Sequence, residues 1–140
     1  VLSAGAPVAI SLLRDLQRLL PAAEIHTPYG MTEVLPVTDI ALPELEQAGM
    51  GNGVCVGQVL PGVHLGISRL DALGRAPGAP LHNIDVTGEI CVSAGHVKDR
   101  YDRLWATEQA SSRDPGWHRT GHQNDAGLAQ AIERFALKRS

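Results

Sequence analysis

The sequence predicts an α/β fold: a β-α-β unit that ends a large parallel-sheet domain, followed by a small antiparallel β-barrel-like subdomain. Two observations predict it. A leucine-rich stretch with helical spacing lies between two short apolar runs at the start of the chain. Later, the chain is rich in glycine and proline and breaks into short apolar runs, which is typical of antiparallel strands joined by turns. We therefore expect three parts: the end of the α/β domain at 1–40, the barrel-like subdomain at 41–124 and a divergent helical tail at 125–140.

The first part reads as a β-α-β unit. Residues 8–20 carry one apolar stripe, which indicates an amphipathic helix. The members of this stripe are Leu12, Leu13, Leu16, Leu19 and Leu20. The runs 1–4 and 24–27 on either side read as strands, and this order predicts parallel strands with a right-handed crossover. Loops after such strands are where α/β folds bind ligands, and Pro28–Glu33 is such a loop.

The second part alternates short strands with turns and single helical turns. We expect strands at 54–58, 63–69 and 86–93, and helices at 43–48, 101–109 and 125–138. Residues 34–40 are apolar and extended in character, and 73–82 are rich in glycine and proline, which predicts a surface loop.

Composition and charge restrict the possible functions. The formal net charge is −3, and nucleic-acid recognition normally needs a basic face, so we expect no nucleic-acid partner. No run approaches the roughly 18 apolar residues of a membrane helix, and charged residues interrupt the leucine-rich segment that could otherwise be a signal peptide. Cys55 and Cys91 lie in apolar runs, which predicts buried free thiols in a reducing, cytoplasmic setting; a disulfide has no framework of further cysteines to support it.

The loop Pro28–Glu33 gathers several chemically different groups. The ring of Tyr29 can stack on a base, and a glycine at position 30 lets the backbone approach a ligand closely. The hydroxyl of Thr32 can donate to a phosphate oxygen, and the carboxylate of Glu33 can hold Mg²⁺. The alternative is an ordinary turn, in which Tyr29 covers the edge of the core and Glu33 is a solvated charge.

A second motif far along the chain supports a functional interpretation of the first. The two strings are Tyr29-Gly30-Met31-Thr32-Glu33 and Gly116-Trp117-His118-Arg119-Thr120-Gly121. In this order they resemble the acyl-adenylating (AMP-binding) superfamily of acyl-CoA synthetases, peptide-synthetase adenylation domains and luciferases. The resemblance implies that ATP or AMP binds at Tyr29, Gly30, Met31 and Thr32, with Tyr29 near adenine and Thr32 at the α-phosphate. It further implies that Glu33 binds Mg²⁺, and that Thr32 and Glu33 are the catalytic residues.

Other segments fit the same resemblance. The small residues Gly5, Ala6 and Pro7 stand where the family lines its adenine and acyl pocket, although such a run is also a common strand-to-helix turn. Residues 57–63 and 88–92 resemble the segments with which the family enters and builds its barrel. Within the latter, Glu89 is either a catalytic carboxylate or a structural one at the start of a strand.

His122 departs from the family. At this place the family has an aspartate that holds both ribose hydroxyls, because a carboxylate can accept two hydrogen bonds. The resemblance implies that His122 takes this nucleotide-binding position. A neutral imidazole offers one acceptor and one donor, so it cannot accept hydrogen bonds from both ribose hydroxyls. His118 and His122 have the spacing of a metal pair on a helix, but Thr120 and Gly121 predict a loop and no third ligand is evident.

The resemblance implies a fragment of an ATP-dependent acyl-adenylating enzyme, most like a fatty acid–CoA ligase. A complete enzyme of this kind converts a carboxylate and ATP to acyl-AMP and pyrophosphate, then passes the acyl group to CoA or another acceptor. The run 27–37 looks most like relatives that act on long-chain hydroxy acids, including β-lactone synthetases. The family's upstream phosphate loop and its C-terminal domain with a catalytic lysine are not found in these 140 residues, so we expect them to be inactive alone.

A second hypothesis comes from another class: a degenerate, non-catalytic domain that acts as a binding or interaction module. His122 and the divergent tail favour it. The chain opens at Val1 as if inside a strand, which reads as a piece of a longer protein with an unpaired sheet edge. Such an edge favours self-association.

Overall fold

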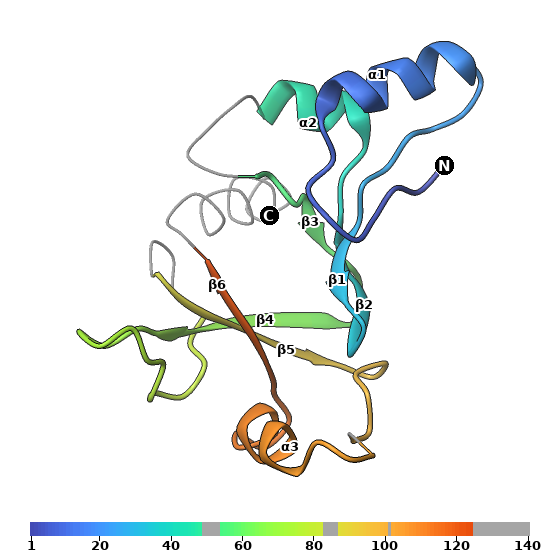
Figure 1. Cartoon of the computed structure of the whole chain (residues 1–140). Helices are drawn as coiled ribbons and strands as arrows, with labels where there is room; N and C mark the ends of the chain where they lie inside the picture. The colour runs from blue at the N-terminus through green and yellow to red at the C-terminus, as the bar shows by residue number, and fades with distance from the viewer. Residues whose placement is uncertain (49–53, 83–86, 101, 125–140) are drawn as a thin grey trace.

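The computed structural model describes residues 1–48, 54–82, 87–100 and 102–124. Figure 1 shows two helices side by side at one end, a small sheet beneath them, and a second sheet that leads to a third helix at the other end. The helices are α1 (Ile10–Leu19), α2 (Leu42–Ala48) and α3 (Trp105–Ser111). The strands are β1 (Tyr29–Met31), β2 (Val34–Asp39), β3 (Gln58–Val59), β4 (Val63–Arg69), β5 (Gly88–Ala94) and β6 (His118–Asn124). The α/β fold class with small antiparallel sheets is therefore confirmed.

The start of the chain forms the predicted parallel unit around α1. Leu2 pairs with His26 in a parallel bridge. The backbone N–H of Ser3 donates to the His26 carbonyl at 3.0 Å, and that of His26 donates to the Val1 carbonyl at 2.9 Å. The two segments form this short ladder rather than full strands, and the helix begins two residues later and ends one residue earlier than predicted.

The first sheet has the order β1-β2-β3 and is antiparallel throughout. It corrects the prediction that Pro28–Glu33 is one loop, because Tyr29 pairs with Thr38 and Met31 with Val34. Only Thr32 and Glu33 form the turn between β1 and β2. The hairpin satisfies backbone groups that a free loop would expose to water.

The strand expected at 54–58 is mostly wrong. Only its last residue, Gln58, falls in β3. Gly57 before it has a φ of 82°, and a Cβ there would lie 2.0 Å from the carbonyl oxygen of Asp39. The chain turns at this glycine against β2, which is why the strand cannot start earlier.

The second sheet has the order β4-β5-β6. The strand predicted at 63–69 is confirmed, and β5 covers most of the one expected at 86–93. The helix expected at 101–109 lies at Trp105–Ser111, and the helix expected at 125–138 falls outside the described residues. The loop at 73–82 is exposed as predicted, yet Leu81 exchanges two backbone hydrogen bonds with Ile67 of β4, at 2.8 and 3.0 Å.

Two apolar cores hold these elements. One lies between the sheets, and its buried members are Val34, Val37, Val63, Ile67, Ile90 and Val92. The other lies beneath α1 and α2, and its buried members are Leu13, Ile25, Ile40, Leu42, Leu45 and Cys55. Both cysteines are buried and free, as predicted. The first sheet draws strands from both sides of residue 40, so the division into 1–40 and 41–124 stays a prediction.

Candidate functional site

The structure brings the two predicted motifs together at Tyr29 and His122. These residues are 93 positions apart, yet the Tyr29 hydroxyl lies 3.4 Å from Nδ1 of His122, a long contact. Their ring centroids are 6.4 Å apart and the planes are tilted by 54°. Burial raises the pKa of Tyr29 to about 12, so its hydroxyl stays protonated at neutral pH and can donate to the imidazole.

The small-residue loop Gly5-Ala6-Pro7 reaches the same end of the first part. Leu2 and His26 pair in parallel, so the segments that follow them, which lead to Gly5 and to Tyr29, leave the ladder in the same direction. All three loop residues are exposed. Gly5 has a φ of 103°, and nothing lies within 4 Å of a Cβ added there, so its flank is open.

The remaining residues of the first motif lie along the hairpin. Met31 is half-buried and packs against the core between the sheets, while Thr32 at the turn is exposed. A Cβ on Gly30 would lie 2.7 Å from the Val34 carbonyl oxygen, so the hairpin itself requires this glycine. The close approach that the sequence predicts at position 30 is thus made by the opposite strand.

Glu33 is the residue expected to hold Mg²⁺. It is half-buried at the hairpin turn, and its carbonyl accepts the backbone N–H of Lys98 at 2.7 Å. Within the described residues no group of three or more His, Cys, Asp or Glu could hold a metal ion by itself. A single carboxylate still suits Mg²⁺, because this ion takes one or two protein carboxylates and completes its shell with phosphate oxygens and water.

The histidine pair does not form a helix-borne metal site. Both residues lie on β6, where His118 is buried and His122 is exposed. Thr120 and Gly121 suggested a loop, which argued against such a site; that loop prediction is wrong, since both residues belong to β6. The strand is irregular there: Gly121 has a φ of 71°, and the register against β5 shifts between Glu89 and Cys91.

Several charged groups, Glu33 among them, act on the buried His118. Burial lowers the pKa of His118, and the positive charge of Lys98 lowers it further, against an upward influence of Glu33, Glu108 and Glu89. Lys98 is itself paired, with its Nζ 2.7 Å from Oε2 of Glu108. His118 is thus held as a neutral imidazole inside the fold.

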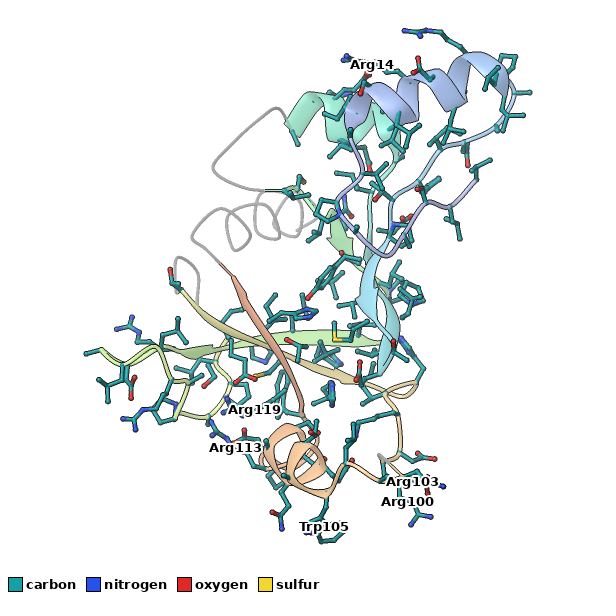
Figure 2. The ribbon with its side chains drawn as sticks, viewed as in Figure 1. Arg14, Arg100, Arg103, Trp105, Arg113 and Arg119 are labelled. Atoms are coloured by element: carbon teal, nitrogen blue, oxygen red, sulfur yellow. The ribbon has the colours of Figure 1, made fainter. Side chains whose placement is uncertain are left out.

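Arg119 is the residue that sequence reasoning missed. Its side chain is only 3% exposed, whereas Arg103 at the outer surface is 92% exposed (Figure 2). Its guanidinium donates to Asp114 Oδ2 at 2.5 Å, Glu89 Oε2 at 2.6 Å, the Ala76 carbonyl at 3.0 Å and Ser68 Oγ at 3.2 Å, and also to the Gly78 carbonyl.

These acceptors keep the guanidinium of Arg119 protonated. Burial alone would lower the pKa of its guanidinium, but the hydrogen bonds to Asp114 and Glu89 outweigh burial and raise it. Arginine rarely lies buried unless it is paired, so a lone arginine in a strand-like run gives no sign of this role.

Comparison with known proteins identifies the family. The sequence model of the family described as "AMP-binding enzyme" matches residues 1–101. The chain belongs to the AMP-binding enzyme family. The matched residues include Gly5, Tyr29 and Glu33, whereas His122 lies beyond them.

Relatives within this family include enzymes of several names. The chain is 37% identical over 122 residues to an olefin β-lactone synthetase of Stenotrophomonas maltophilia. This alignment covers 81% of the chain and 22% of that protein. Among solved structures it resembles apo MatB from Rhodopseudomonas palustris, with a TM-score of 0.65, 25% identity and coverage of 96% of the chain and 23% of MatB.

A second solved structure supports the fold alone. It is O-succinylbenzoate coenzyme A synthetase from Bacillus subtilis in complex with ATP and magnesium, with a TM-score of 0.62, 24% identity and coverage of 87% of the chain and 23% of that chain. The chain therefore spans about a quarter of the length of the relatives it matches. In the described part of the present chain, no helix is long and apolar enough to span a bilayer.

Proposed function

We propose that this chain forms part of the nucleotide site of an ATP-dependent acyl-adenylating enzyme. Such an enzyme joins a carboxylic acid to AMP with release of pyrophosphate, and then passes the acyl group to a thiol. The observation that carries the proposal is the contact of Tyr29 with His122, because it brings the first family motif against the residue that directly follows the second. Membership of the AMP-binding enzyme family supports it.

The residues take separate roles in this proposal. Tyr29 offers its ring to the adenine, and Gly5, Ala6 and Pro7 supply an open wall without bulky side chains. Thr32, exposed at the hairpin turn, donates its hydroxyl to the α-phosphate and so stabilises charge that develops there. Glu33 at the same turn would hold Mg²⁺, which supplies charge neutralisation to the phosphates when bound.

The relatives support a proposal for the substrate and the acceptor. A long-chain fatty or hydroxy acid is the proposed carboxylic acid, because the run 27–37 is similar to β-lactone synthetases and one such enzyme is a 37% identical relative. CoA or another acceptor takes the acyl group. A cytoplasmic location accords with the two free, buried cysteines. Self-association accords with the exposed leucines Leu2, Leu12 and Leu19.

The test is calorimetric titration of AMP, and of ATP with Mg²⁺, into the 140-residue chain and its His122→Asp variant. A carboxylate at position 122 can accept two ribose hydroxyls, so we expect His122→Asp to bind AMP about tenfold more tightly than the unmodified chain. His64→Asp is the matched control, since it makes the same change at an exposed position on β4. Equal affinity of all three proteins for AMP would remove the support for a nucleotide site at Tyr29.

A degenerate binding module is the second candidate function. The observation that favours it is His122 itself, which occupies the ribose position with a side chain that cannot accept two hydroxyls. Pyrophosphate release separates the two. An acid-dependent release of pyrophosphate by this chain, or by a longer protein that contains it, supports the enzyme, and a longer protein that binds nucleotide without releasing pyrophosphate supports the module.

A further inference from the structure

Glu89 on β5 binds two points of β6, the buried side chain of Arg119 and the backbone beside His122. Its Oε2 accepts Nη1 of Arg119 at 2.6 Å, and its Oε1 accepts the backbone N–H of Gly121 at 3.1 Å. Gly121 directly precedes His122 on β6. One carboxylate therefore connects the interior of the fold to the backbone beside the candidate nucleotide site (Figure 2 marks Arg119).

The interior end of this connection is firmly held. Arg119 has four further acceptors besides Glu89: Asp114, Ser68 and the carbonyls of Ala76 and Gly78. The Glu89 side chain is 17% exposed and that of Arg119 is 3% exposed, so water competes little for these bonds. The guanidinium thus fixes the position of the Glu89 carboxylate.

The outer end of the connection is a backbone that needs support. Gly121 has a φ of 71°, and the pairing of β6 with β5 is irregular between Glu89 and Cys91. The hydroxyl of Thr120 donates to the Ile90 carbonyl at 2.9 Å and accepts the backbone N–H of His122 at 3.0 Å. Glu89 and Thr120 thus accept two consecutive backbone N–H groups of β6, those of Gly121 and His122.

We infer that Glu89 is a positioning residue of the nucleotide site: held by Arg119, it fixes the Gly121 backbone so that residue 122 faces Tyr29. It does this without touching the nucleotide. The inference deepens the function proposed above and rests on it for the nature of the ligand, a nucleoside monophosphate or triphosphate. Glu89 would then be neither a catalytic carboxylate nor only a structural one, because it acts through the backbone of the site.

The chemistry of the position explains why a carboxylate is required. Glu89 accepts two hydrogen bonds with two different oxygens. A glutamine of the same shape has one oxygen and one NH₂ group, so it can serve only one of the two donors. The bond to the charged guanidinium is the stronger one, so Glu89→Gln should keep Arg119 and turn its NH₂ group toward the Gly121 N–H.

The experiment is nuclear magnetic resonance of the 140-residue chain without nucleotide. In the unmodified chain, a coupling across the hydrogen bond should join the Gly121 nitrogen to the Glu89 side-chain carboxyl carbon. In Glu89→Gln, the Gly121 amide should exchange with solvent about tenfold faster, and the cross-relaxation between the Tyr29 and His122 rings should weaken. Ser68→Ala is the control: it removes a different acceptor of Arg119, and it should leave the Gly121 and His122 signals in place.

AMP affinity gives an independent reading in the His122→Asp background. There, adding Glu89→Gln should weaken AMP binding about tenfold, and adding Ser68→Ala should not. Absence of the coupling in the unmodified chain overturns the inference, whatever the variants do. An unchanged Gly121 amide in Glu89→Gln, or an equal change in Ser68→Ala, also overturns it. If the Gly121 and His122 signals change as expected but no protein binds AMP, the positioning role stands and the proposed nucleotide function fails.

Discussion

Arg119 and His122 lie three residues apart on β6, and their surroundings differ sharply. Arg119 is 3% exposed and is bonded to two carboxylates, one hydroxyl and two carbonyls. His122 is exposed, and among the described residues its ring contacts Tyr29 at a long 3.4 Å. Several hydrogen bonds thus hold the Arg119 side chain in the interior. The exposed His122 is held mainly through its backbone and, among the described residues, by its contact with Tyr29.

The difference separates scaffold from ligand contact. A buried charge cannot lose its partners without a large cost, so the interaction set of Arg119 constrains every neighbour. An exposed residue such as His122 can change with little effect on folding. In the site proposed above, the departure from the family's aspartate falls at an exposed position, where the fold tolerates a change of side chain.

The largest expected effect comes from breaking the interior end. Arg119→Met keeps most of the volume but leaves the Glu89 and Asp114 carboxylates without their buried cation, which should lower the free energy of unfolding by about 3–5 kcal/mol. Urea unfolding of the 140-residue chain measures it. Arg14→Met is the control, because the Arg14–Glu46 pair is exposed and should contribute less than about 1 kcal/mol. Equal losses in the two variants would contradict the buried role of Arg119.

A smaller effect, dependent on pH, is expected from His118 at the start of the same strand. Burial and Lys98 lower its pKa in the folded state, so the unfolded chain takes up a proton first as the pH falls below about 6.5. The contribution of His118 to the free energy of unfolding should therefore be constant above that pH and should decline below it. Urea unfolding between neutral and mildly acidic pH measures the slope.

The matched variant for this prediction is His118→Gln, which keeps a polar side chain that does not titrate. Because other histidines also titrate in this range, the quantity to compare is the difference in slope between the two proteins. The unmodified chain should lose more stability on acidification than His118→Gln. A steeper loss in the variant would mean that His118 is charged inside the fold.

The smallest effect on stability is expected at the exposed end. His122→Ala removes only the long contact to Tyr29 and should change the free energy of unfolding by less than about 0.5 kcal/mol. Denaturant unfolding beside Arg119→Met makes the comparison direct. A loss above roughly 2 kcal/mol in His122→Ala, the scale of a lost buried contact, would place His122 in the scaffold instead.

The sequence predicted the elements whose pattern is local. The strand Val63–Arg69 and the helix around Leu13 follow from apolar spacing, and the burial of Cys55 and Cys91 follows from their apolar neighbours. The strand Tyr29–Met31 was missed, because the proline and glycine in this run are typical of turns and the pairing that makes it a strand lies further along the chain.

The candidate site could be predicted only in part. The motif residues Tyr29 and His122 were named from the resemblance, and the structure places them in contact. The burial of Arg119 and its bond to Glu89 could not be predicted, because the other partners of Arg119 come from segments as distant as Ser68 and Ala76 and no spacing along the chain encodes that meeting. Three-dimensional pairing of charges is the information that a single sequence lacks.

The most direct test of the account compares AMP with 2′,3′-dideoxy-AMP, which lacks both ribose hydroxyls, in binding to the unmodified chain and to His122→Asp. If position 122 faces the ribose, His122→Asp should strengthen binding of AMP by about tenfold and leave binding of the dideoxy nucleotide unchanged. An equal gain for both nucleotides, or no gain for AMP, would contradict the claim that β6 keeps the scaffold of a nucleotide site and departs from the family at its ribose contact.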